Sequence, residues 1–224
     1  MKFVIGIPFI VGLDFTRKAL HSISSYWERT YVIDSSVPPD PPASAIWRQG
    51  EAWTPMRLPI PIGMAQSVNV ILALGETHDC DVIFYMHNDA EAGDGTIDNL
   101  LELAARYTRE NRKWAVLFTA YDALCCYNLA CVRDIGPWDA WLFPFPYYGD
   151  NDWHRRVQLG GWELIDTGLP CAHFGSHSLK INPKYKFLNQ ITFDNQCDIY
   201  KKKWGGHPGQ ETFTRPFNGA IEYP

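Results

Sequence analysis

The sequence has no CxxC pair among its 6 cysteines, which are Cys80, Cys125, Cys126, Cys131, Cys171 and Cys197. Structural zinc sites usually pair their cysteines at that short spacing, so we expect no such site. A chain of 224 residues can also bury a full core without the disulfide framework of small secreted domains. Free, buried thiols are therefore expected.

Long apolar runs are missing as well. No segment reaches the roughly 18 apolar residues that a membrane-spanning helix needs. The opening residues 1–13 are apolar, but they contain Gly6 and Pro8 and only one basic residue, Lys2. They also lack a small-x-small cleavage site, unlike a secretory signal peptide. The sequence thus predicts a cytoplasmic protein without a membrane span.

An excess of positive charge is absent, since the net charge is −5. This argues against a protein that binds a nucleic-acid backbone. Aromatic residues are plentiful, with 9 Trp, 11 Tyr and 12 Phe. Such rings suit the stacking of bases or sugars, although core packing uses most of them in any fold.

Strands and helices alternate along the first half of the chain. Apolar runs predict strands at 2–9, 31–33 and 81–86, and helical spacing predicts helices at 15–28, 63–74 and 97–107. This alternation favours a single α/β domain at residues 1–180 with a mainly parallel sheet. Further strands are predicted at 114–120, 123–132 and 162–166, and a helix from Asp150, its candidate N-cap, to about Leu159.

Two segments lack regular patterns. Residues 37–61 hold 7 of the 16 prolines and cannot be regular throughout. Beyond Lys180 the periodicity ends, so we expect residues 181–224 to form an irregular C-terminal tail that packs on or covers the site. Its patch Trp204-Gly205-Gly206-His207 is either a lid over the site or an ordered structural tail.

Polar or special residues follow three of the predicted strands. These strand ends carry Pro8-Phe9, Asp34-Ser35-Ser36 and His87-Asn88-Asp89. Ligands of parallel α/β sheets bind beyond the carboxyl ends of the strands, so these residues should converge on one crevice. Asp89 and Glu91 offer oxygen ligands for Mg²⁺ or Mn²⁺. A solvated acidic turn is the alternative for this pair.

Two further groups in the second half can carry chemistry. Asp150 and Asp152 either complement the dipole of a helix start or supply a general base in a partly dry pocket. His173 follows a strand and is a candidate third metal ligand. The proline- and aromatic-rich loop 136–149 contains Trp138, Trp141, Tyr147 and Tyr148, which form either a binding wall for sugars or a hydrophobic plug.

Taken in order, these pieces resemble the inverting nucleotide-sugar glycosyltransferases with the GT-A (Rossmann-like) fold, in the large family-2 group. Ile7-Pro8-Phe9 resembles the family's opening strand and nucleotide-contacting turn, YVIDSS at 31–36 its V-D-N-x-S signature, and GMAQSVN at 63–69 its G-x-x-x-A-x-N helix start. His87-Asn88-Asp89 occupies the D-x-D position. The resemblance covers roughly residues 2–178.

Later motifs continue the resemblance. GPWD at 136–139 resembles the G-x-F-D-E element, Asp150-x-Asp152-x-x-x-Arg156 resembles E-D-x-D-x-x-x-R, and His173-Phe174-Gly175-Ser176 resembles the histidine segment near metal and phosphate. Two positions depart from the family: His87 replaces the first acid of D-x-D, and Gly149 replaces the acid before the base. The compact size and the tail are similar to virus- or phage-encoded members, which would act in the host cytoplasm.

The resemblance implies specific roles. It places Asp150 at the catalytic base, with Asp152 two residues beyond, and Asp89 and His173 at a Mn²⁺ or Mg²⁺ ion. It implies nucleotide contacts at Pro8, Phe9, Asp34 and Asn88, and acceptor contacts at Trp138, Trp141, Tyr147 and Tyr148. The implied reaction is one in-line displacement that moves a sugar from a nucleotide-diphosphate donor, expected to be a UDP-sugar, to an acceptor hydroxyl with inversion.

Two other classes of protein remain open. A sugar-nucleotide nucleotidylyltransferase would share the α/β design, but it would want a glycine-rich, basic loop after the first strand, where this chain has IGIPFIVGLD. A non-catalytic carbohydrate-binding protein would explain the aromatic residues but not the converging acids. The acceptor is also open: a glycan, a protein, a lipid and a modified nucleobase all carry suitable groups.

Overall fold

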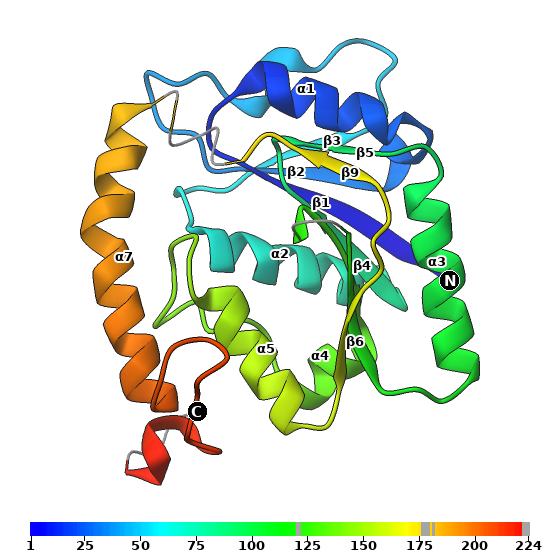
Figure 1. Cartoon of the computed structure of the whole chain (residues 1–224). Coiled ribbons are helices and arrows are strands. Elements are labelled where there is room, and N and C mark those ends of the chain that lie inside the picture. Colours follow the sequence, from blue (N-terminus) through cyan, green and yellow to red (C-terminus); the bar gives the residue numbers. More distant parts are fainter. Residues whose placement is uncertain (120–121, 176–179, 181, 221–224) are drawn as a thin grey trace.

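A seven-stranded sheet forms the centre of the computed structural model, which describes residues 1–119, 122–175, 180 and 182–220 (Figure 1). The strand order is β3-β2-β1-β4-β7-β6-β8. The strands are β1 (Phe3–Phe9), β2 (Thr30–Asp34), β3 (Thr54–Arg57), β4 (Val82–Met86), β6 (Trp114–Phe118), β7 (Leu124–Asn128) and β8 (Glu163–Asp166). All neighbours pair in parallel except at β7, which is antiparallel to β4 and β6. The predicted α/β domain with a mainly parallel sheet is confirmed.

Helices cover both faces of this sheet. Helices α1 (Leu13–Ser22) and α3 (Thr96–Arg109) pack on one face, and α2 (Met64–Thr77), α4 (Leu129–Ile135) and α5 (Gly149–Leu159) pack on the other. Side chains of a strand alternate between faces, so Ile5 and Ile7 of β1 join the first core and Val4 joins the second. Burial on both faces explains why these strands are continuous apolar runs in the sequence.

A second, two-stranded sheet lies beyond the end of β4. Its strands are β5 (Ala90–Ala92) and β9 (Cys171–His173), which pair antiparallel with Ala90 opposite His173. The backbone N–H of Phe174 also donates to the carbonyl of Asp89 at 3.0 Å. This pairing brings a late segment of the chain back to the D-x-D-like position.

Three predicted elements differ from the structure. The segment predicted as one strand at 123–132 is β7 followed by α4, because the Asn128 side chain accepts a hydrogen bond from the Ala130 N–H and caps a helix there. Helix α1 stops at Ser22, and a 3₁₀ helix, Ser24–Arg29, continues to β2. Helix α5 begins at Gly149, so Asp150 lies in its first turn rather than at the N-cap.

The irregular C-terminal tail was a wrong expectation, because residues 183–204 form the long helix α7 (Pro183–Trp204). Asn182 caps its start by accepting from the Lys184 N–H, and Gly205 ends it in the left-handed conformation at φ 77°. Its buried residues include polar ones, Gln196 and Lys203, beside Tyr200 and Trp204. The helix therefore has no clean apolar stripe, which is why the sequence pattern hid it.

The start of α2 contacts the aromatic loop directly. Gly63 lies at the N-cap of α2, where its N–H donates to Oε1 of Gln66 at 2.8 Å. A Cβ at Gly63 would lie 2.0 Å from the carbonyl oxygen of Pro144. Only glycine allows this approach of the two segments.

Among the described residues, no helix combines the length and the apolar composition that crossing a membrane requires.

Candidate functional site

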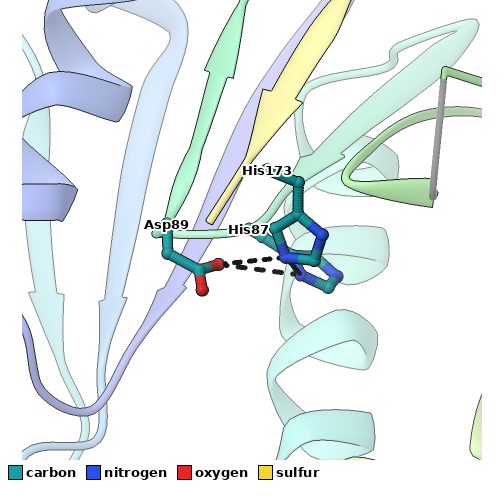
Figure 2. A group of neighbouring side chains, drawn as sticks. All are labelled: His87, Asp89 and His173. Carbon is teal, nitrogen blue, oxygen red and sulfur yellow. Dashed lines mark hydrogen bonds and ion pairs between the residues drawn. The ribbon is translucent and has the colours of Figure 1, made fainter. Parts of the chain in front are cut away.

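Two histidines and one aspartate gather at the carboxyl end of β4. Figure 2 shows the carboxylate of Asp89 pointing at the imidazoles of His87 and His173. Asp89 Oδ1 lies 3.3 Å from His173 Nε2 and 4.0 Å from His87 Nδ1, and the two ring nitrogens are 3.2 Å apart. One ligand atom from each residue lies within 4.8 Å of the others. We call these three residues the His-Asp cluster.

The fold explains why the His-Asp cluster forms. His87 follows the last residue of β4, and its N–H donates to the carbonyl of Ala123 at 2.9 Å. Asp89 lies in the turn between β4 and β5, and the pairing of β5 with β9 places His173 above it. His87 and His173, 86 positions apart in the sequence, thereby become neighbours.

The electrostatics of the cluster suit a cation. Burial, aided by the charge of His173, lowers the pKa of His87 to about 4, so its imidazole is neutral near pH 7 with a lone pair available. The hydrogen bond to Asp89 raises the pKa of His173 above its ordinary value. Asp89 itself is buried, with 6% of its surface exposed. Two imidazole nitrogens and one carboxylate are a donor set that could hold a first-row divalent ion.

A cavity of about 700 Å³ opens beside the His-Asp cluster. On the side of β1 and β2 it is lined by Pro8, Phe9, Ser35 and Val37. On the side of β6, β7 and α5 its lining residues are Phe118, Asp122, Cys125, Tyr127, Asp150 and His154. Because β4 lies between β1 and β7 in the sheet, the His-Asp cluster separates these two sides.

Two carboxyl groups line the second side of the cavity. Burial raises the pKa of Asp150 above its ordinary value, against the lowering effect of backbone hydrogen bonds. Burial and then the nearby Asp150 charge raise the pKa of Asp122 to about 6, while His173 opposes this shift. A buried carboxyl whose pKa moves toward neutrality can accept a proton from a bound hydroxyl.

Most of the residues expected at the site do line this cavity. They are Pro8, Phe9, Asn88, Asp89, Trp138, Tyr147, Asp150 and His173. Asn88 also fixes the loop between β1 and α1, since its Nδ2 donates to the carbonyl of Val11 at 2.9 Å and to Thr16 Oγ1 at 3.2 Å.

Asp34 and Asp152 lie elsewhere. Asp34 is buried, and its two carboxylate oxygens accept from the N–H groups of Ser36 and Ala43 at 2.9 and 3.0 Å. Asp34 thus holds the chain after β2, and the cavity lining there is Ser35 and Val37. Asp152, fully buried, points toward the end of α7.

Two aromatic residues expected at the acceptor lie outside the cavity lining too. Trp141 is 86% exposed. Tyr148 packs on Phe193 and Tyr200 of α7, with ring centroids 5.6 and 5.5 Å apart. Both belong to the loop between α4 and α5, whose other aromatic residues, Trp138 and Tyr147, do reach the cavity. Ser176, the last residue of the histidine segment, lies outside the described residues.

His87 was expected at the crevice but was not assigned as a metal ligand, although it stands at the first position of the D-x-D-like motif. Several other cavity residues were not predicted from the sequence. His154 follows Asp150 by four residues, so helical spacing could have placed both on one side of α5. Lys184, Tyr185, Leu188 and Asn189 from the start of α7 also line the cavity. No local sequence pattern predicted that the start of α7 would line the cavity.

Comparisons with known proteins find solved structures with a similar fold. No family model and no curated protein matches the sequence. Among solved structures, the mannosyltransferase PcManGT from Pyrobaculum calidifontis, in complex with GDP-Man and Mn²⁺, superposes with a TM-score of 0.59 at 13% identity, over 86% of this chain and 63% of that one. S. aureus TarS 1–349 superposes with a TM-score of 0.52 at 14% identity, over 71% of this chain and 56% of that one. The complex of TarS 1–349 with UDP superposes with a TM-score of 0.52 at 13% identity, over 71% of this chain and 55% of that one.

The shared fold is therefore that of GT-A glycosyltransferases, at sequence identities too low to show more than the fold. The chain spans less than two-thirds of the length of each of these structures.

Proposed function

We propose that the protein is a metal-dependent, inverting glycosyltransferase of the family-2 type, which moves a hexosyl group from a nucleotide-diphosphate donor to an acceptor hydroxyl. The observation that carries this proposal is the position of Asp150 on the same cavity as the His-Asp cluster. A group able to accept a proton and a group of cation ligands then face one substrate. The fold shared with nucleotide-sugar transferases agrees with this assignment.

The ion is proposed to be Mn²⁺, held by His87, Asp89 and His173. Nitrogen ligands favour Mn²⁺ over Mg²⁺, which prefers oxygen alone. When bound, the ion would neutralise charge on the donor's diphosphate. PcManGT carries Mn²⁺ together with its nucleotide sugar, which supports the choice.

The donor is assigned to the β1–β2 side of the cavity and the acceptor to the α5 side. Pro8 and Phe9 would contact the nucleoside of a UDP- or GDP-sugar, with Asn88 nearby and Asp34 shaping the loop behind them. Trp138 and Tyr147 would pack on the acceptor, because the C–H faces of sugars pack well on aromatic rings. The start of α7 would cover part of the cavity.

Asp150 would act as the general base. It removes the proton from the acceptor hydroxyl as that oxygen attacks the anomeric carbon on the face opposite the diphosphate. The bond to the diphosphate breaks as the new glycosidic bond forms, so the anomeric configuration inverts. Asp150 carries this role without Asp152, whose carboxylate has other partners.

Thermal-shift assays with UDP, GDP, CDP and TDP, each with and without Mn²⁺, test the donor site. A nucleotide that binds the folded protein raises the melting temperature. We expect one nucleotide to stabilise the protein, Mn²⁺ to enhance the effect, and Asp89→Ala to remove the enhancement. The absence of any response would contradict the transferase and favour a carbohydrate-binding protein.

Release of nucleoside diphosphate from the matching nucleotide sugar tests the base. Asp150→Asn should lower turnover in the presence of mixed sugar acceptors by roughly 10²- to 10⁴-fold, the usual contribution of general base catalysis. Nucleotide binding should persist. Asp94→Asn, an exposed carboxyl between β5 and α3, is the matched control and should retain wild-type turnover. Equal turnover in both variants would show that Asp150 is not the general base.

A further inference from the structure

His154 is a partly buried residue whose ring Nε2 is itself buried and has no hydrogen-bond partner among the described residues. It lies on α5, one helical turn after Asp150, and both residues line the cavity. Its ring is held edge-on by Phe118, with ring centroids 5.2 Å apart. Buried polar atoms are nearly always paired in native proteins, so an unpaired one on a cavity wall indicates a ligand that completes it.

Asp122 faces the same side of the cavity from the turn before β7. The N–H of Asp122 donates to the carbonyl of Thr119 at 3.2 Å, and its carbonyl accepts from Cys125 Sγ at 3.1 Å, so the backbone of Asp122 is held on both sides. The carboxyl lies close enough to Asp150 for each charge to affect the other. Two carboxyl groups and an imidazole thus surround the place where the acceptor oxygen must sit.

No lysine or arginine lines this side of the cavity among the described residues. The one lysine in the lining, Lys184, comes from the start of α7. Burial lowers the pKa of His154 to about 4, so its imidazole is neutral and offers one donor and one acceptor. An anionic acceptor would meet two carboxyl groups on this side, whereas hydroxyl groups can both donate to and accept from these side chains.

Resting on the proposed transferase function, we propose that Asp122 and His154 bind two hydroxyl groups of a neutral saccharide acceptor on either side of the hydroxyl that Asp150 deprotonates. The buried indole Nε1 of Trp138, which also has no partner among the described residues, is a further donor on this wall. The acceptor is therefore an uncharged sugar, not a phosphorylated or carboxylated one. His154 and Asp122 set its orientation, and through it which hydroxyl is glycosylated.

Saturation-transfer-difference NMR tests this site on the full chain. The protein is loaded with Mg²⁺, the diamagnetic substitute for Mn²⁺, and with the nucleotide that stabilises it in thermal shift. The probes are methyl glucopyranoside and methyl mannopyranoside as neutral sugars, and methyl glucuronide as an anion. We expect the neutral glycosides to bind and the glucuronide to bind at least tenfold more weakly.

Variants assign the effect to the two residues. His154→Phe keeps a ring but removes its hydrogen-bonding groups. This variant and Asp122→Ala should each lower the affinity for the neutral glycosides at least tenfold. His154→Gln should restore part of the affinity. His21→Phe on the exposed side of α1 is the matched control. Each variant must keep its nucleotide response, which shows that it is folded.

The outcomes separate this inference from the proposed function. Equal glycoside binding by all variants, or no glycoside binding by the nucleotide-bound wild type, overturns the inference and leaves the transferase standing. If no nucleotide binds the wild type, the proposed transferase function is rejected. Glycoside binding is then measured with the nucleotide-free protein, and that result alone tests the saccharide subsite. His154-dependent binding would then support the same subsite in a carbohydrate-binding protein.

Discussion

Asp150 and Asp152 lie two residues apart on the first turns of α5, yet their surroundings differ completely. Asp152 is fully buried among donors: Lys203 Nζ at 2.8 Å, Trp204 Nε1 at 2.8 Å and Arg156 Nε at 3.1 Å. Lys203 also contacts Asp139 at 2.7 Å. Asp150 lines the cavity, and its charge helps to raise the pKa of another carboxyl, Asp122.

The difference separates a carboxylate whose charge is compensated by side-chain donors from one that lines a cavity without them. The donors around Asp152 compensate its charge and tie the end of α7 to α5. Burial without such compensation leaves Asp150 with a pKa above its ordinary value. The residue type is shared, but residues two apart on a helix face in nearly opposite directions, so Asp150 meets the cavity and Asp152 meets the end of α7.

Removing Asp152 should have the largest effect on stability. Asp152→Ala leaves Lys203 buried with one carboxylate instead of two, and breaking a buried ion pair lowers the free energy of unfolding by about 3 to 5 kcal/mol. Urea denaturation followed by tryptophan fluorescence measures the change. Asp198→Ala removes an exposed partner of Lys201 on the same helix and should leave the midpoint unchanged. Similar midpoints for Asp152→Ala and wild type would show that α7 is held by apolar contacts alone.

Neutralising Asp122, a carboxyl of the cavity, should raise the free energy of unfolding, whereas Asp152→Ala should lower it. Because the folded-state pKa of Asp122 is raised from 3.8 to about 6, the unfolded state releases its proton first as the pH rises, and stability is lost across that interval. Asp122→Asn should therefore be more stable than wild type at pH 7, by about 1 to 2 kcal/mol after screening of this partly exposed group. The difference should shrink as the pH falls from 6 toward 4 and vanish below about pH 3, where both states are protonated. A constant difference from pH 4 to 8 would exclude titration of Asp122 as its cause.

The smallest effect is expected at the other end of α7. Asp40 Oδ2 accepts from Asn182 Nδ2 at 3.1 Å and from the Tyr185 hydroxyl at 3.3 Å, and these bonds join the start of α7 to the proline-rich segment. Asp40→Ala should cost about 1 kcal/mol or less. Hydrogen exchange should become faster in the first turns of α7 but not around Trp204. Uniform exchange along the whole helix would mean that its two ends are held equally.

Much of the fold was accessible from the sequence because its signals are local. The strands β1 and β4 are continuous apolar runs, and α3 has an apolar stripe between Ile97 and Ala104. The strand-end rule for parallel sheets then brought Pro8, Asn88 and Asp89 to one cavity. These inferences needed no knowledge of distant contacts.

The remainder depended on tertiary contacts. Helix α7 buries Lys203 against Asp139 and Asp152, so its sequence has the polarity of a surface segment. The choice between Asp150 and Asp152 rests on those same contacts. Trp141 and Tyr147 belong to one aromatic loop, and only the path of that loop decides which ring meets the cavity.

The close approach of Gly63 to the carbonyl of Pro144 links two walls of the cavity mechanically. Gly63 begins α2 beside Ile62 and Met64 in the cavity lining, and Pro144 precedes Phe145, Pro146 and Tyr147 on the other wall. With room for only a hydrogen atom between them, neither wall can move inward here alone. The aromatic loop can be remodelled on either side of Pro144, but a glycine must be kept at position 63 for the two walls to meet here.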